Sequence, residues 1–169
     1  MLRRLLELVL DTEHEEELHI VLLDWSKAFD KVSHKGLLHS LERLGIPDDI
    51  IRSIKMLYSN PQFRVKQKGR RSEWYQCKAG IRQGCPLSPY LFIAWMSVMM
   101  HDVDGSLTMP VRKDIQSFAT RQRLQNPLPF QDIQYADDTI LLAVLLERAQ
   151  EMIIEIQKRA EEDNMSFNT

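Results

Sequence analysis

The apolar residues of this chain recur with two different spacings, one typical of strands and one typical of helices. Residues 19–24 (HIVLLD) form a short apolar run that ends in an acid, which predicts a buried strand. Residues 33–44 and 47–58 place apolar side chains on one face at helical spacing. Gly45 is expected to end the first of these helices. Pro47 fits the first position of the second helix, and the acids that follow it suit the positive end of the helix dipole.

The middle of the chain predicts a hairpin followed by an apolar helix. Residues 63–67 and 73–80 are expected to form two strands joined by a basic turn around Gly69. Ser88-Pro89 suits the N-cap and first position of a helix, which we expect to span residues 88–100.

The two ends and the remaining linker complete the pattern. Residues 2–10 predict an amphipathic helix, and residues 145–162 alternate apolar and charged side chains at helical spacing. Residues 102–130 are rich in proline and polar side chains, so we expect a mobile connection with one short helix. Residues 132–143 predict two short strands that flank an acidic turn. Interspersed strands and helices indicate an α/β or α+β fold with helices packed on a sheet.

Length and composition are those of one globular domain. The chain has 169 residues, of which 44% are hydrophobic and 27% are charged. No apolar run is long enough to span a bilayer. The N-terminal apolar stretch is broken by Glu7 and is followed by acids, so it does not predict a secretion signal. Cys77 and Cys85 form no CxxC pair and predict free thiols.

Charge is unevenly distributed although the formal net charge is only −2. Acids are concentrated in residues 11–17, whereas bases are concentrated in residues 62–82. The local basic excess could contact a phosphate backbone, or it could be only a solvated hairpin. The bases are Arg64, Lys66, Lys68, Arg70, Arg71, Lys78 and Arg82.

Chemistry is carried by three segments. Asp24 ends the predicted strand in LDWSKAFD, where a ligand could reach it. Residues 80–89 (GIRQGCPLSP) have a backbone path set by two glycines and two prolines, which suits close approach by a ligand. Asp137 and Asp138 are adjacent carboxylates in a tight turn, and they repel one another unless a cation is near.

Each segment also has a structural explanation. Asp24 could be a helix cap or a turn residue, residues 80–84 could be a simple turn, and the paired acids could be a solvated turn. All three occurring together favour two-metal phosphoryl transfer, in which hard divalent cations are held by carboxylates and substrate phosphates.

These segments resemble three motifs of the reverse transcriptase domain of non-LTR (LINE-type) retrotransposons. LDWSKAFDKVSHKGLL (23–38) resembles motif A, GIRQGCPLSPYLF (80–92) resembles motif B, and QYADDTILLA (134–143) resembles motif C. The likeness runs from about residue 1 to the last residue, and it is loose across residues 102–130. It implies an α+β fold, the palm of a right-hand polymerase, in which helices pack on one face of an antiparallel sheet, together with part of the fingers.

The resemblance also implies a role for each matching residue. Asp24, Asp137 and Asp138 are the catalytic acids and hold two Mg²⁺ ions, or Mn²⁺ in their place, helped by the carbonyl of Trp25. Asp137 is preferred to Asp138 as the stronger ligand. The remaining implied roles are those of Phe29 as the steric gate that selects dNTPs, Gln83 and Gly84 at the nucleotide and template base, and Tyr135 near the primer terminus. Phe29 could instead be an ordinary core residue.

The expected partners are an RNA template, a DNA primer and dNTPs, with no membrane. The sequence shows no compartment signal; an intracellular setting is expected, and a LINE-type origin would make it nuclear. Residues 1–169 are expected to be palm and partial fingers of a polyprotein, without its N-terminal fingers and thumb. The last residues, NMSFNT, resemble the beginning of motif D. Two alternatives stay open: an inactive remnant that binds RNA or protein, and an RNA-dependent RNA polymerase, against which Phe29 argues.

Overall fold

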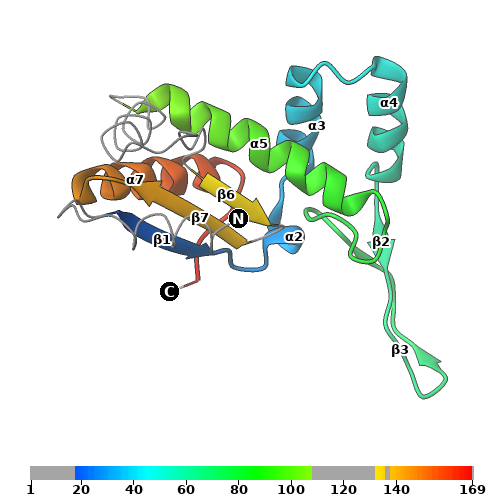
Figure 1. The fold of residues 1–169 in the computed structure, drawn as a ribbon. Helices are drawn as coiled ribbons and strands as arrows, with labels where there is room; N and C mark the ends of the chain where they lie inside the picture. Colours follow the sequence, from blue (N-terminus) through cyan, green and yellow to red (C-terminus); the bar gives the residue numbers. More distant parts are fainter. Residues whose placement is uncertain (1–17, 108–131, 136–137, 169) are drawn as a thin grey trace.

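The computed structural model describes residues 18–107, 132–135 and 138–168, which form a sheet covered by helices and a ribbon that projects from it (Figure 1). Three antiparallel strands lie in the order β1-β7-β6. The α+β prediction is therefore confirmed. The strands of this sheet are β1 (His19–Asp24), β6 (Asp132–Tyr135) and β7 (Asp138–Ala143). The helices are α2 (Ala28–Lys31), α3 (His34–Arg43), α4 (Asp48–Leu57), α5 (Ser88–Ser106) and α7 (Leu146–Glu162).

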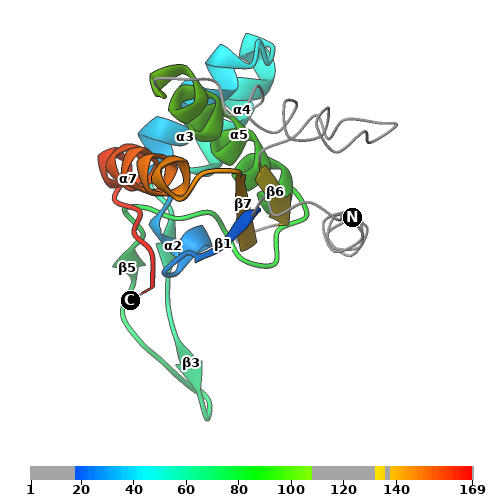
Figure 2. The same cartoon turned by 60° about the vertical axis from the view of Figure 1, so that its left-hand side comes forward.

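The helices build outward from a face of the sheet that carries a row of buried side chains. Leu23 and Thr139 are partners across β1 and β7, and both are buried, as is Leu141 on the same face. Helix α7 packs on β1 and β7, α5 packs on α7 and α3, and α3 packs on α4 (Figure 2). None of the helices in the described part of the chain is long and apolar enough to cross a membrane.

Most of the predicted helices are confirmed, and two of their starts are corrected. Gly45 has a φ of 71° and follows the end of α3, as its position predicts. Pro47 is the N-cap of α4 and not its first helical residue. Ser88 is not an N-cap: it is the first residue of α5, and its hydroxyl donates to the Arg82 carbonyl at 2.5 Å. The hydroxyl is thus used to fix the preceding loop.

The predicted irregular connection begins later than expected. Helix α5 continues to Ser106, so the prediction of irregular structure from residue 102 onward is wrong for residues 102–106. The rest of that connection, from residue 108, lies outside the described residues, as does the predicted helix at residues 2–10.

The predicted hairpin is confirmed, with shorter strands than expected. Strand β2 (Gln62–Phe63) pairs with β5 (Tyr75–Gln76), and β3 (Lys66–Gln67) pairs with β4 (Arg70–Arg71). Lys68 and Gly69 connect β3 to β4 with φ angles of 46° and 80°, as a two-residue hairpin turn requires. We call residues 62–76 the ribbon; in Figure 1 it extends away from the sheet and the helices.

Candidate active site

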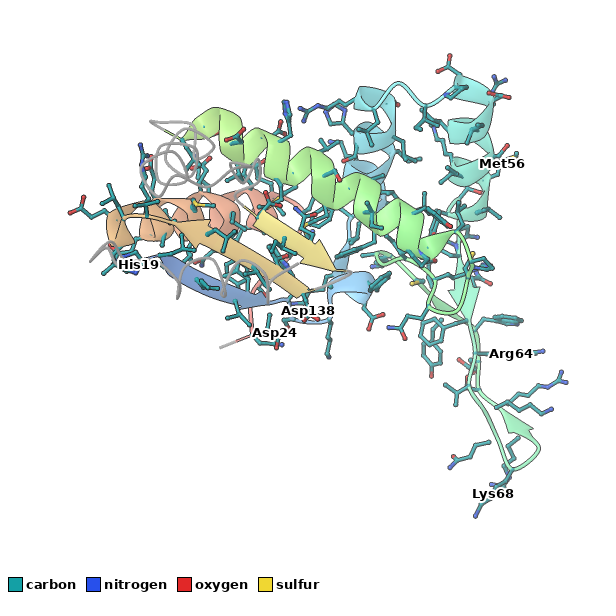
Figure 3. All side chains as sticks on the ribbon, in the orientation of Figure 1. His19, Asp24, Met56, Arg64, Lys68 and Asp138 are labelled. Atoms are coloured by element: carbon teal, nitrogen blue, oxygen red, sulfur yellow. The ribbon has the colours of Figure 1, made fainter. Side chains whose placement is uncertain are left out.

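Two of the predicted acids face each other across neighbouring strands. Asp24 and Asp138 are Cα partners in the β1–β7 pair, so their side chains project from the same face of the sheet. Both are exposed, and they lie close together at the end of these strands in Figure 3. Like charges directly opposite one another destabilise a sheet, so this position suits a cation.

The third acid lies in the connection between β6 and β7. Asp138 is also the partner of Tyr135, which leaves Ala136 and Asp137 as a two-residue connection between the strands. This arrangement confirms the two predicted strands. Asp137 and the side chain of Tyr135 are outside the described residues, so the preference for Asp137 over Asp138 stays a prediction.

Asp24 is held by a residue that the sequence reasoning missed. The side-chain amide of Asn168 donates to Asp24 Oδ2 at 2.8 Å, and its backbone N–H donates to the Asp24 carbonyl at 2.9 Å. The segment continues alongside motif A, since Ser26 N–H donates to the Ser166 carbonyl at 2.9 Å and Trp25 forms a bridge with Phe167. NMSFNT was recognised as the start of motif D, but this contact joins residues 144 positions apart.

Trp25 is anchored below the carboxylates. Its side chain is 2% exposed, its indole N–H donates to the Thr139 hydroxyl at 3.1 Å, and its ring centroid lies 4.6 Å from that of Phe167. The backbone that carries Asp24 is therefore fixed on both sides, by β7 and by the C-terminal segment. The role of the Trp25 carbonyl as a metal ligand stays a prediction.

Motifs A and B are joined by a close backbone approach. The N–H of Gly80 donates to the Val32 carbonyl at 2.9 Å, and the N–H of Ile81 donates to the Phe29 carbonyl at 2.6 Å. A Cβ atom on Gly80 would lie 2.6 Å from the Asp30 carbonyl oxygen, so only glycine permits this contact. The Gln83 amide also donates to Asp30 Oδ1 at 2.8 Å, which gives Asp30 a role that the sequence reasoning missed.

The structure brings the predicted nucleotide-binding residues together. Phe29, Gln83 and Gly84 line a pocket of about 390 Å³ at the start of α5, with Cys85, Pro86, Ser88 and Pro89. Phe29 is half-buried and stacks on Phe92, with ring centroids 4.6 Å apart and 20° between the planes. Phe29 therefore packs on the core and also borders the pocket, so a role as a core residue is compatible with a role as a steric gate.

A second pocket adjoins the first through Gln83. It measures about 600 Å³ and has mainly apolar walls, which include Tyr58, Phe63 and Ile81 together with the polar side chains of Asp30 and Gln83. Because Gln62 and Phe63 belong to the ribbon, this pocket connects the base of the ribbon to motif B.

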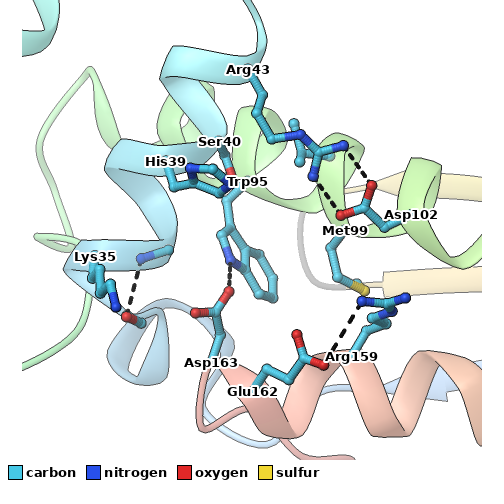
Figure 4. Close-up of a pocket in the computed structure, with 13 residues that line it drawn as sticks. Lys35, His39, Ser40, Arg43, Trp95, Met99, Asp102, Arg159, Glu162 and Asp163 are labelled. Carbon is cyan, nitrogen blue, oxygen red and sulfur yellow. Dashed lines mark hydrogen bonds and ion pairs between the residues drawn. The ribbon is translucent and has the colours of Figure 1, made fainter.

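A further pocket lies among the helices, and several of its polar groups pair with one another (Figure 4). Arg43 donates two hydrogen bonds of 2.5 Å to Asp102, and these hold the pKa of the Asp102 carboxyl below its usual value and raise the pKa of Arg43. The Trp95 indole donates to Asp163 at 2.6 Å. No lining residue of this pocket comes from β1 or β7, so we assign it to helix packing.

The donor set at the sheet edge fits a hard divalent cation. Within the described ranges, no group of three or more His, Cys, Asp or Glu side chains is arranged to hold a metal ion. Asp24 and Asp138 offer two carboxylates on one face, and no ion pair to either is found among the described residues. Carboxylate oxygens together with substrate phosphates are what Mg²⁺ requires.

Comparisons with known proteins agree with this geometry. The family model described as reverse transcriptase (RNA-dependent DNA polymerase) matches residues 2–169. A Pol polyprotein from the R2 retrotransposable element of Nasonia vitripennis is 30% identical over 153 residues, which are 89% of this chain and 13% of that protein. An RNA-directed DNA polymerase from the mobile element jockey of Drosophila melanogaster is 31% identical over 99 residues, which are 58% of this chain and 11% of that protein.

A solved structure shares the fold at low sequence identity. Apo telomerase from Candida tropicalis, truncated from its C-terminal domain, superposes with a TM-score of 0.53 and 12% identity, over 99% of this chain and 33% of the telomerase chain. The palm fold expected from the motifs is thereby confirmed. The chain spans only about an eighth of the length of the R2 polyprotein that it matches.

Proposed function

This chain belongs to the reverse transcriptase (RNA-dependent DNA polymerase) family, as the reverse transcriptase domain of a non-LTR retrotransposon, and we propose that it supplies the palm of an RNA-directed DNA polymerase. The reaction adds dNTPs to a DNA primer along an RNA template. The observation that carries the proposal is the direct pairing of Asp24 with Asp138 at the end of β1 and β7.

Asp24, Asp137, Asp138 and the Trp25 carbonyl would hold two Mg²⁺ ions, for which Mn²⁺ could substitute. When bound, such ions activate the primer hydroxyl and neutralise charge on the triphosphate and the departing pyrophosphate. The chain itself contributes a fixed arrangement of acids. Asn168 binds Asp24 Oδ2, and no hydrogen bond to Asp24 Oδ1 is found among the described residues, so that oxygen is available to a ligand.

The pocket beside motif B would receive the incoming nucleotide. Phe29 is held against Phe92, so its ring cannot withdraw without breaking a core contact. A fixed ring there excludes a ribose 2′-hydroxyl and selects dNTPs. Gln83, oriented by Asp30, and Gly84 would contact the nucleotide and the template base. Tyr135 would lie near the primer terminus.

Primer extension tests the proposal, with the segment expressed together with the regions that flank it in its reading frame. We expect Mg²⁺-dependent extension with dNTPs, reduced by roughly 10²–10³-fold or more in Asp24→Asn and in Asp137→Ala, because charge stabilisation in the transition state is lost. Asp48→Asn, an exposed acid at the start of α4, is the matched control.

Unchanged extension by Asp24→Asn would show that the metal site is assigned wrongly. Incorporation of rNTPs in preference to dNTPs would identify an RNA polymerase. Phe29→Ala should admit rNTPs while dNTP incorporation is retained, and no change in sugar selection would refute the gate.

A further inference from the structure

The ribbon of residues 62–76 displays apolar and aromatic side chains that no core covers. Phe63, Val65, Trp74 and Tyr75 are each between 51% and 58% exposed. A two-stranded ribbon is only marginally stable by itself. Phe63 and Tyr75, partners across β2 and β5, stack with ring centroids 5.8 Å apart, which stabilises the strand pair but leaves about half of each side chain exposed. Such side chains on a projecting element indicate a binding surface.

Cations surround these aromatic side chains. The ribbon contains five basic residues and a single acid, Glu73, and no ion pair to any of the five is found among the described residues. Lys66 and Arg71 are direct partners across β3 and β4, which places two like charges on one face at a cost to the strand pair. A polyanion bound there would remove this repulsion. The five basic residues are Arg64, Lys66, Lys68, Arg70 and Arg71.

Trp74 is arranged as a stacking platform. The Arg64 guanidinium lies 4.6 Å from the centroid of the Trp74 ring, and 58% of Trp74 is still exposed. Cation–π contact orients the ring and brings a positive charge beside it. An ordered aromatic ring next to a cation can bind a base and its phosphate together, which is how proteins hold single-stranded nucleic acid without reading its sequence.

The ribbon also leads toward the nucleotide pocket. Gln62 and Phe63, at the base of the ribbon, line the pocket of about 600 Å³ that also contains Asp30 and Gln83. Figure 3 shows Arg64 and Lys68 farther along the ribbon. Gln83 lines the neighbouring pocket with Phe29 and Gly84. A strand bound along the ribbon could therefore continue into these pockets, and a membrane or protein partner would not account for this continuity.

We propose that the ribbon binds the single-stranded template before it is copied, with a base stacked on Trp74 and phosphates bound by Arg64, Lys66 and Arg71. Single strands are required because duplex bases are already stacked on one another and cannot stack on Trp74. This inference rests on the proposed function for its choice of an RNA template, but its binding test does not require catalysis.

The test measures the affinity of the full chain for fluorescently labelled oligonucleotides, using fluorescence anisotropy as the signal. Trp74→Ala should weaken binding of single-stranded RNA by about 5- to 150-fold, as loss of one stacked base predicts, whereas Trp74→Phe should retain most of the affinity. The double variant Lys66→Ser/Arg71→Ser should reduce the slope of log K against log salt by about 1.4. Lys55→Ser/Lys158→Ser, on exposed positions of α4 and α7, is the matched control and should change the slope less.

Iodide quenching gives a second readout. Trp25 and Trp95 are 2% and 1% exposed, so quenching reports mainly on Trp74, and bound single strands should protect it. Duplex RNA should give weaker protection. Equal affinity of Trp74→Ala and the parent, or protection by anionic vesicles but not by RNA, would overturn the proposal.

Failure of this inference can be told apart from failure of the proposed function. One informative result is RNA binding that depends on Trp74 while the chain with its flanking regions extends no primer. That result would contradict the proposed polymerase function and support the proposed role of the ribbon. If primer extension requires Asp24 but no ribbon variant changes the affinity for RNA, the proposed polymerase function is supported and the proposed role of the ribbon is contradicted. Tighter binding to single-stranded DNA than to RNA would overturn the assignment of the strand as RNA template.

Discussion

The carboxylate end of β1 and β7 and the tip of the ribbon both place like charges opposite one another on paired strands. Asp24 faces Asp138 in the first, and Lys66 faces Arg71 in the second. The two pairs differ in how the strands that carry them are packed. The acids stand on a sheet whose other face is packed by helices, whereas the strand residues of the ribbon are all exposed.

This difference matches two kinds of ligand. A metal site requires oxygen atoms held within a few tenths of an ångström, which a packed sheet and a buried Trp25 provide. A flexible strand of variable sequence needs only charge and a stacking surface, which an exposed ribbon provides. Repulsion between like charges is tolerated in both places, and in both it indicates a ligand of the opposite charge.

Replacing Gly80, which lies against the backbone that follows Asp24, and Gly69 at the tip of the ribbon should give the largest contrast. Gly80 and Gly69 have similar φ angles of 92° and 80°, but a Cβ atom on Gly80 meets the Asp30 backbone, while a Cβ atom on Gly69 meets nothing within 4 Å. Gly80→Ala should lower the free energy of unfolding by more than about 3 kcal/mol. Gly69→Ala should lower the stability of the ribbon by only about 1–2 kcal/mol, the cost of placing a residue with a Cβ atom in the left-handed conformation. Urea denaturation followed by circular dichroism measures both, and equal losses would contradict the contrast in support.

Removing the amide that holds Asp24 should have an intermediate effect. We expect Asn168→Ala to weaken Mn²⁺ binding by about 10- to 100-fold, as loss of an outer-shell partner does, with little change in thermal stability. Electron paramagnetic resonance of Mn²⁺ measures the affinity, and Gln157→Ala, exposed on α7, is the control. Unchanged affinity would show that Asn168 only ties the C-terminal segment to β1.

Neutralising one acid of the facing pair should stabilise the metal-free chain. Asp24→Asn removes the repulsion from Asp138 and keeps an oxygen for Asn168, so the free energy of unfolding should rise by up to about 1 kcal/mol. Asp48→Asn should have the opposite sign, because an acid in the first turn of α4 favours the helix dipole. Thermal denaturation in EDTA tests this, and a fall in stability for Asp24→Asn would show that the facing acids do not repel.

The smallest effect is expected where opposite charges already neutralise each other. Arg43 lowers the pKa of Asp102 in the folded state, so the pair stabilises the fold above the unfolded pKa, near pH 4, and the contribution is lost as the pH falls through the lowered folded pKa. This pair is partly exposed, so it should contribute less than about 1 kcal/mol. Asp102→Asn should flatten the dependence of unfolding free energy on pH below about 4; an unchanged dependence would refute the assignment.

Local patterns were sufficient to predict most elements and the family. Helical spacing of apolar residues predicted α3, α4 and α7, and the acid after HIVLL predicted the end of β1 correctly. Gly69 predicted the ribbon turn, since a positive φ favours glycine wherever the rest of the chain lies. The motifs around Asp24, Gln83 and Asp138 were sufficient to recognise a reverse transcriptase.

Long-range contacts were decided only by the tertiary structure. Three contacts join segments that are distant in sequence. They are the pairing of Asp24 with Asp138, the hydrogen bond from Asn168 to Asp24, and the close approach of Gly80 to the Asp30 backbone. Ser88 was misassigned for a more local reason, because its hydroxyl donates to the Arg82 carbonyl six residues earlier and does not cap the helix that it begins. Residue types and local spacing determine which side chains can do chemistry, whereas strand register and packing determine which of them meet, because register depends on the whole buried face of the sheet.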